Sequence, residues 1–332
     1  MALIARGDTE TLLAVVCRVL RDPSHLGRTL PEATRGSARP DPREVIGDLV
    51  LLIRRRLGMA GIKQLRFAAP NLVTGIGLVC GFLSLIAAHE HRFVDAGWLI
   101  IWCVLIDRLD GLVARSLNAS SEFGVQMDSL ADAVNFGVCP AYLVYITLSS
   151  VPALGFDSGM GHVLLLVASI AWLAANVFRL AKFNVVTEEA GGVFFGVATT
   201  LAAGVLAVWY QVLLKYGQAG SPLSFPDGFT GPRLLGDLQI PLSTWGYLPA
   251  AMIVMALLMV SNAPMPKLGR FPSRAATIFV IGTAACGFLF GFMRYLPEFM
   301  AWMPTSWMLM FLVWGQLNPR WRSLEPPEFL PE

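Results

Sequence analysis

Eight long apolar segments constrain the fold of this chain more than any other feature of its sequence. Each is long enough, or nearly so, to cross a bilayer as a helix, and they lie at about 70–88, 93–115, 126–149, 160–181, 192–214, 244–262, 275–293 and 299–316. Hydrophobic residues make up 55% of the 332 residues and charged residues 14%, which excludes an ordinary soluble domain. The sequence therefore predicts an all-α, polytopic membrane bundle of about eight transmembrane helices.

The basic residues between these segments predict the orientation of the bundle. If the N-terminus lies inside, most Arg and Lys residues fall in cytoplasmic loops, as the positive-inside rule requires. The opposite side then receives Arg92, Lys215, Arg233 and Arg294. We therefore expect both termini, and the loop that follows the second segment, on the cytoplasmic side.

The two ends of the chain are predicted to lie outside the bundle. Residues 1–42 are predicted to form a disordered extension, and within it residues 22–42 are rich in Pro, Gly, Arg and Asp. In the juxtamembrane segment 43–66, residues 43–58 combine an apolar stripe with a basic end, which is typical of an amphipathic helix at the lipid headgroups. A solvated helix packed on the bundle is the alternative. Residues 318–332 are predicted to be a cytoplasmic tail.

The stretch from Asp107 to Asp132 carries four aspartates beside or inside the second and third apolar segments. Asp107 and Asp110 are three residues apart, and Asp128 and Asp132 are four apart, so each pair lies on one face of a helix. The polar residues 116–122 are enough to turn the chain between two helices. We therefore expect two neighbouring helices to present four carboxylates to each other.

Four carboxylates in a medium of low dielectric constant repel one another, and Arg115 alone cannot balance them. A hard divalent cation, Mg²⁺ or Mn²⁺, binds oxygen ligands and also suits a site that receives phosphate oxygens. Gly111, Ala114 and Gly124 are small and would let a ligand approach the helix backbone. The pattern predicts a metal-dependent site for a phosphate-bearing nucleotide. The alternatives are acidic helix ends that face water and the carboxylate relay of an ion-coupled transporter, which does not require the small residues.

These residues resemble the signature of the CDP-alcohol phosphatidyltransferases. The match is Asp107-x-x-Asp110-Gly111-x-x-Ala114-Arg115, eight residues, then Gly124-x-x-x-Asp128-x-x-x-Asp132, without a gap. The resemblance implies a catalytic membrane domain over 67–265, formed by the first six helices, and two additional helices over 266–317. It also implies transfer of a phosphatidyl group from a CDP-linked lipid, CDP-diacylglycerol, to an alcohol, with release of CMP.

The resemblance also implies roles for individual residues. The ligands of the Mg²⁺ or Mn²⁺ would be Asp107, Asp110, Asp128 and Asp132. Asp132 would in addition act as the general base for the acceptor hydroxyl. The nucleotide-binding residues would be Asn71, Thr74, Gly111, Ala114, Arg115 and Gly124. For Asn71 and Thr74, a plain helix-capping role is the alternative.

Two further segments resemble the phosphatidylserine synthase branch of this family, namely 129–141, SLADAVNFGVCPA, and 179–184, RLAKFN. This chain departs from the branch at Asn135, where Ser is usual, and at Lys182, where Arg is usual. L-serine is therefore the predicted acceptor, with glycerol 3-phosphate, an inositol compound or choline as alternatives. The residues predicted to bind the acceptor or a phosphate are Asn135, Arg179, Lys182 and Asn184. For Arg179 and Lys182 the alternative role is to set the topology.

The family also implies a cellular setting and partners. We expect a homodimer in the inner (cytoplasmic) membrane of a bacterium, in contact with membrane lipid, with the active site on the cytoplasmic side. The expected small partners are CDP-diacylglycerol and L-serine, and no nucleic-acid partner is expected.

Overall fold

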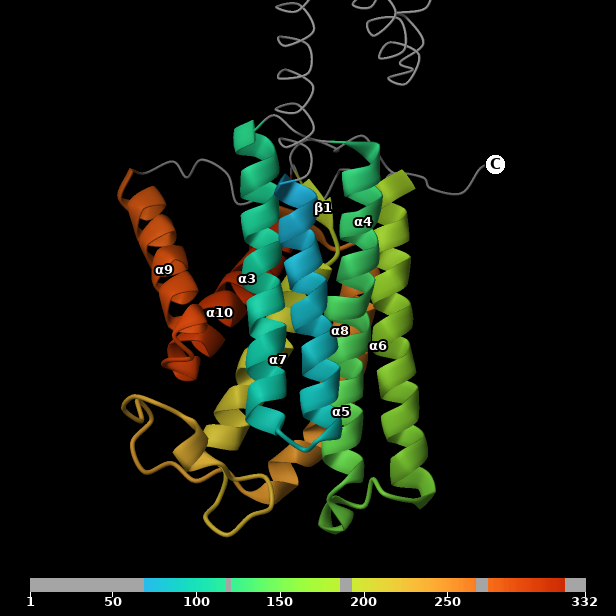
Figure 1. Cartoon of the computed structure of the whole chain (residues 1–332), viewed down its shortest axis with the longest axis vertical. Helices are drawn as coiled ribbons and strands as arrows, with labels where there is room; N and C mark the ends of the chain where they lie inside the picture. Colours follow the sequence, from blue (N-terminus) through green and yellow to red (C-terminus); the bar gives the residue numbers. More distant parts are fainter. Residues whose placement is uncertain (1–68, 118–120, 186–192, 267–273, 320–332) are drawn as a thin grey trace, which may run out of the picture. The chain divides into compact units, whose positions relative to one another are not determined.

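The computed structural model describes residues 69–117, 121–185, 193–266 and 274–319 (Figure 1). Within these ranges the chain is helical apart from its loops and two strands of three residues each. The predicted all-α membrane bundle is thus confirmed. The predicted extension 1–42 and the amphipathic helix 43–58 lie outside the described residues.

A helix occupies each of the eight predicted segments. The first is Ala69–His89, drawn in blue in Figure 1. The others are α3 (Phe93–Leu117), α4 (Glu122–Asp132), which continues through the π-helix η4 (Ala133–Val138) into α5 (Cys139–Ser149), α6 (Gly159–Val185), α7 (Thr199–Lys215), α8 (Leu248–Val260), α9 (Arg274–Phe292) and α10 (Pro297–Leu317). Short 3₁₀ turns lie at Pro152–Leu154, Pro226–Gly228 and Leu242–Tyr247.

Four helical stretches among the described residues are long and apolar enough to span a membrane by length and composition. They are Ala69–His89, Glu122–Ser149, Gly159–Asn184 and Leu242–Val260. Helix α3 has the length of a span, but it carries the charged residues of the aspartate motif. These spans, with the shorter apolar helices beside them, describe an integral membrane protein.

The fifth predicted segment begins later than expected. We predicted helix from residue 192, but β1 (Val193–Phe195) pairs antiparallel with β2 (Pro264–Pro266), and α7 begins only at Thr199. Gly196 separates strand from helix with a φ of 77°, and a Cβ there would lie 2.5 Å from the Met259 carbonyl oxygen. A positive φ and a close backbone approach both favour glycine, so the chain turns here before the helix can start.

Helix α6 packs against α5, η4 and α8, while α7 lies between α3 and α10. The largest fully buried side chains include Trp98, Trp172 and Trp245. The indole Nε1 of Trp172 on α6 donates a hydrogen bond of 2.9 Å to the carbonyl oxygen of Phe136 in η4. A π-helix changes the backbone hydrogen-bonding pattern inside an apolar core. The Trp172 bond gives a partner to one carbonyl of η4, four residues after Asp132.

The helix Ala69–His89 packs closely on its neighbours at two glycines, Gly77 and Gly81, where no side chain keeps the backbones apart. The Cys103 thiol donates to the Gly77 carbonyl at 3.4 Å, and the Cys139 thiol donates to the Gly81 carbonyl at 3.3 Å. Asn135 of η4 also lies against this helix, because a Cβ on Gly81 would fall on the Asn135 Oδ1. Small residues at such contacts let membrane helices approach each other closely.

We expect Gly81→Ala to destabilise the bundle by about 1–3 kcal/mol, the usual cost of overpacking a filled contact. The added methyl group would collide with the Asn135 side chain and would lie 3.4 Å from the Cys139 Sγ. Thermal unfolding of the detergent-solubilised protein measures the effect as a lower midpoint. Gly75→Ala on the same helix is the matched control, because its Cβ would lie 3.8 Å from Met127 Cε in ordinary contact. Equal midpoints for the two variants would contradict this packing.

A buried ion pair attaches the C-terminal helices to the rest of the bundle. Lys215 Nζ, at the end of α7, lies 2.7 Å from Glu298 Oε1, at the start of α10, and the two side chains are 3% and 1% exposed. The Tyr216 hydroxyl donates to the same Glu298 oxygen, and Lys215 also donates to the Pro232 carbonyl at 3.0 Å. Buried charges persist when they are paired and hydrogen-bonded, as they are here.

Candidate active site

The four aspartates lie at one end of α3 and along α4. Asp107 and Asp110 are in the second half of α3, Asp128 is in α4, and Asp132 ends α4 where the π-helix begins. Helix α4 starts at a conventional N-cap, because the Ser121 side chain accepts a hydrogen bond of 3.0 Å from the Gly124 amide. This cap sets where α4 starts, and with it which residues of α4 face α3.

The structure brings three of the four carboxylates together. Asp107, Asp110 and Asp128 each offer a carboxylate oxygen, and these oxygens all lie within 4.8 Å of one another. Asp110 is 7% exposed, and its Oδ2 accepts a hydrogen bond of 2.9 Å from the Thr74 hydroxyl. Three convergent carboxylates without an equal number of cations fit a hard divalent ion such as Mg²⁺ or Mn²⁺, which prefers oxygen ligands.

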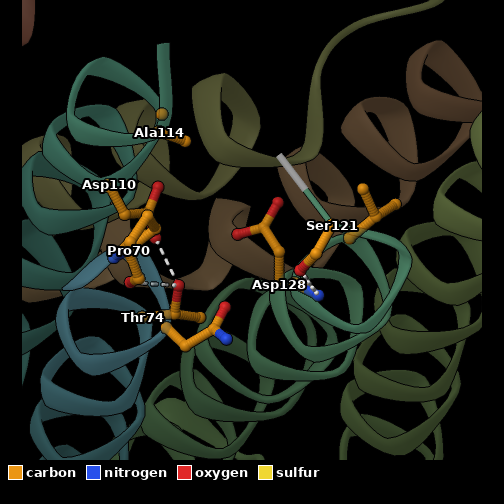
Figure 2. A pocket seen from close by; sticks show the side chains of 10 residues that line it. Pro70, Thr74, Asp110, Ala114, Ser121 and Asp128 are labelled. Atoms are coloured by element: carbon orange, nitrogen blue, oxygen red, sulfur yellow. Dashed lines mark hydrogen bonds between the residues drawn. The ribbon is translucent and has the colours of Figure 1, made fainter. Parts of the chain in front are cut away.

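An open pocket lies beside this triad (Figure 2). Figure 2 shows Asp110 and Asp128 on opposite sides of it, from α3 and α4, with Thr74 from the first helix below them. Its lining is Pro70, Asn71, Thr74, Asp110, Gly111, Ala114, Ser121, Gly124, Val125 and Asp128. Residues from three helices therefore border the space beside the triad.

Five of the six predicted nucleotide-binding residues line this pocket, namely Asn71, Thr74, Gly111, Ala114 and Gly124. Gly124 is needed for its shape, because a Cβ there would lie 3.1 Å from both Asn71 Oδ1 and Ser121 Oγ. Arg115 does not line the pocket. It is exposed, and its Nη1 lies 3.4 Å from the position of a Cβ on Gly111.

Asp132 lies deeper than the triad, at a second group of polar residues. It is 9% exposed and hydrogen-bonds Asp107, which also hydrogen-bonds Thr200 at the start of α7. Arg179 of α6 is half-buried and close enough to Asp132 for their charges to interact. Asp107 therefore connects the carboxylate triad to the deeper group.

The other residues predicted to contact the acceptor have partners elsewhere. Asn184 Nδ2 donates to Ser129 Oγ at 2.9 Å, which links α6 to α4. Lys182 Nζ donates to Asn262 Oδ1 at 2.9 Å, beyond the end of α8. Asn135 faces Gly81 on the first helix. Arg179 lies near enough to Asp132 for their charges to interact.

Sequence reasoning missed three residues of this site. Ser121 lies in the polar connection 116–122 and was not singled out, although a Ser before a helical pattern is a recognisable N-cap. Thr200 lies within the predicted apolar segment 192–214, whose pattern does not indicate its position beside Asp107. Asn176 is a polar residue inside an apolar helix, three residues before Arg179, and this placement alone is a signal of function.

Comparison with known proteins gives consistent results. A family model described as CDP-alcohol phosphatidyltransferase matches residues 67–225. The CDP-diacylglycerol–serine O-phosphatidyltransferase of Helicobacter pylori (strain ATCC 700392 / 26695) is 34% identical over 199 residues, which are 60% of this chain and 71% of the relative. The enzyme of the same name from Mycobacterium leprae is 30% identical over 263 residues, 77% of either chain. That of Bacillus subtilis is 29% identical over 168 residues, 47% of this chain and 89% of the relative.

Proposed function

The chain belongs to the CDP-alcohol phosphatidyltransferase family, and we propose that it transfers the phosphatidyl group of CDP-diacylglycerol to L-serine. The products are phosphatidylserine and CMP. The observation that carries this proposal is the carboxylate triad of Asp107, Asp110 and Asp128 beside a pocket lined by the first helix, α3 and α4. The family model matches residues 67–225, which contain both, and relatives named for the same reaction are 34% and 30% identical to this chain.

The triad would hold the divalent cation, Mg²⁺ or Mn²⁺. Asp132, which hydrogen-bonds Asp107, would be a further ligand. When bound, the cation supplies positive charge that neutralises the diphosphate of the nucleotide lipid. Thr74 orients Asp110 for this role by donating to its Oδ2. Second-shell hydrogen bonds of this kind fix the direction in which a ligand oxygen points.

The pocket residues would bind the cytidylyl end of the substrate. The side chain of Asn71 offers both a donor and an acceptor for a base or a ribose, and Gly124 leaves room beside it. Gly111 and Ala114 on α3 would let the nucleotide approach the helix closely, and Arg115 would contact a phosphate from the rim. In this arrangement the lipid-side phosphorus would lie between the triad and Asp132.

Asp132 would act as the general base. The serine Oγ attacks the lipid-side phosphorus, a new O–P bond forms, and the bond to the CMP oxygen breaks, so that CMP leaves with the electron pair. The proton of the serine hydroxyl passes to the Asp132 carboxylate. Burial of this carboxylate at 9% exposure keeps bulk water away from the attacking position. Arg179 would hold the acceptor carboxylate beside it.

The positive-inside pattern supports an active site on the cytoplasmic side of the inner membrane, with both termini inside. CDP-diacylglycerol would then reach the pocket laterally from the lipid, and serine would arrive from the cytoplasm. A homodimer is the oligomeric state that we propose from the family.

The test is an incubation of membranes that contain the protein with labelled CDP-diacylglycerol, Mn²⁺ or Mg²⁺, and one candidate alcohol at a time. We expect L-serine to release CMP and to form phosphatidylserine. Glycerol 3-phosphate, an inositol compound and choline are the parallel arms. Release of CMP with one of these and none with L-serine would keep the reaction class and overturn the acceptor.

A further inference from the structure

Asn176 in α6 is a buried polar residue with no role in the reaction proposed above. It is 0% exposed, and neither its Oδ1 nor its Nδ2 has a hydrogen-bond partner among the described residues. Nearly all buried polar groups in folded proteins have a partner, and an unpartnered amide inside an apolar core is costly. A side chain that is retained at such a cost indicates a partner that binds during function.

The position of Asn176 relates it to the deeper group of the active site. It precedes Arg179 by three residues, so the two side chains lie on the same face of α6, about one helical turn apart. Asn176 faces Gly137 of η4, because a Cβ on Gly137 would lie 3.1 Å from the Asn176 Oδ1. Gly137 follows Asp132 by five residues, which is the hydrogen-bonding interval of a π-helix. Asn176 therefore lies one level below the Asp132–Arg179 contact.

We propose that Asn176 recognises the amino-acid end of the acceptor, directly below the reacting hydroxyl. This inference rests on the proposed function, with L-serine as the acceptor. With the serine hydroxyl at Asp132 and the serine carboxylate at Arg179, the free Nδ2 of Asn176 donates to a carboxylate oxygen. Its free Oδ1 accepts a hydrogen from the ammonium group.

An unpartnered amide selects among the candidate acceptors because it has a donor and an acceptor to satisfy. L-serine carries both a carboxylate and an N–H donor. Choline has no N–H group, and glycerol 3-phosphate and inositol compounds carry no ammonium group. A buried site built to form hydrogen bonds strongly rejects analogues that leave its polar groups unpaired. Asn176 thereby favours serine over choline, and the parallel arms with glycerol 3-phosphate and an inositol compound test discrimination against acceptors whose hydroxyl groups could also pair with the amide.

The first test is Asn176→Ala in the full-length protein, with KM for L-serine, KM for CDP-diacylglycerol and turnover measured separately. Loss of the amide should raise the KM for serine about tenfold to a hundredfold, the effect of one or two buried hydrogen bonds. The KM for CDP-diacylglycerol should stay within about twofold, because Asn176 does not line the nucleotide pocket. The thermal midpoint should not fall, since the variant removes groups that have no partner in the fold.

Ser169→Ala is the matched control. Ser169 also lies on α6 with a buried hydroxyl that has no partner among the described residues, seven residues before Asn176. About two turns of helix separate it from Asn176, so it is remote from the acceptor. We expect its KM for serine to match that of the wild type.

A second variant gives a readout that a purely structural role would not change. Asn176→Asp has nearly the same shape but places a negative charge where the serine carboxylate would bind. It should therefore lower kcat/KM for L-serine at least tenfold more than kcat/KM for ethanolamine, which has an ammonium group and no carboxylate. This comparison also tests the inference if the alanine variant does not accumulate in the membrane.

The possible outcomes are distinct. If the wild type releases CMP with L-serine while both variants keep the wild-type serine KM and the wild-type serine-to-ethanolamine ratio, Asn176 does not bind the acceptor and the inference is overturned alone. If the wild type releases no CMP with L-serine, the proposed acceptor fails and this inference fails with it.

Discussion

Replacing Asp132 by Asn is expected to lower turnover by about a hundredfold to ten-thousandfold, the range that general-base catalysis contributes. The amide has the size of the carboxylate but cannot accept the proton of the acceptor hydroxyl. Asp132 is 9% exposed and lies outside the nucleotide pocket, so CDP-diacylglycerol binding should remain measurable. Turnover with L-serine and equilibrium binding of CDP-diacylglycerol, measured on the same preparation, separate the two effects.

Glu122→Gln provides the matched control for this variant. Glu122 is an exposed acid in the first turn of α4, so the substitution makes the same chemical change on the same helix away from the site. Its turnover should equal that of the wild type. Full turnover in Asp132→Asn would remove Asp132 from the role of base, whereas loss of substrate binding in that variant would show that it acts chiefly as a ligand of the cation.

The second large effect is expected from Asp128→Asn. Asp128 supplies the α4 side of the carboxylate triad, opposite Asp107 and Asp110 on α3. Loss of a direct ligand should raise the metal concentration for half-maximal activity at least about a hundredfold, since even second-shell changes cost about tenfold to a hundredfold. The measurement is activity after chelator treatment and titration with Mn²⁺ or Mg²⁺. The treated wild type should be inactive and should recover in full.

Ser129→Ala tests whether a substitution in α4 that leaves the triad intact also raises the metal requirement. Ser129 is the next residue on the helix, and its hydroxyl pairs with Asn184 on α6. This variant should titrate with metal like the wild type. An unchanged metal requirement in Asp128→Asn, or full activity of the wild type in chelator, would show that the triad does not hold the ion.

The acidic site was predictable from spacing alone. Intervals of three and four residues place Asp107 with Asp110, and Asp128 with Asp132, on single helix faces, and the structure has these faces opposed. The small residues at Gly111 and Gly124 border the pocket as expected. The helical period assigns residues to faces within one helix, so these faces can be predicted without knowing which helices lie beside it.

Contacts between distant segments were not predictable in the same way. The start of α7 depends on the pairing of β1 with β2 and on the left-handed backbone of Gly196, and Thr200 lies at this start, beside Asp107. The π-helix after Asp132 breaks the 3.6-residue period, so it reassigns the faces of the residues that follow. Asn135, predicted at the acceptor, therefore lies against Gly81.

The Lys215–Glu298 contact makes the two positions dependent on each other. Neutralising one side chain alone would leave the other charge buried without its counter-ion, at a cost of about 3–5 kcal/mol. Substitutions that remove both charges together avoid this cost. The junction between α7 and α10 therefore tolerates change at the pair more readily than at either residue.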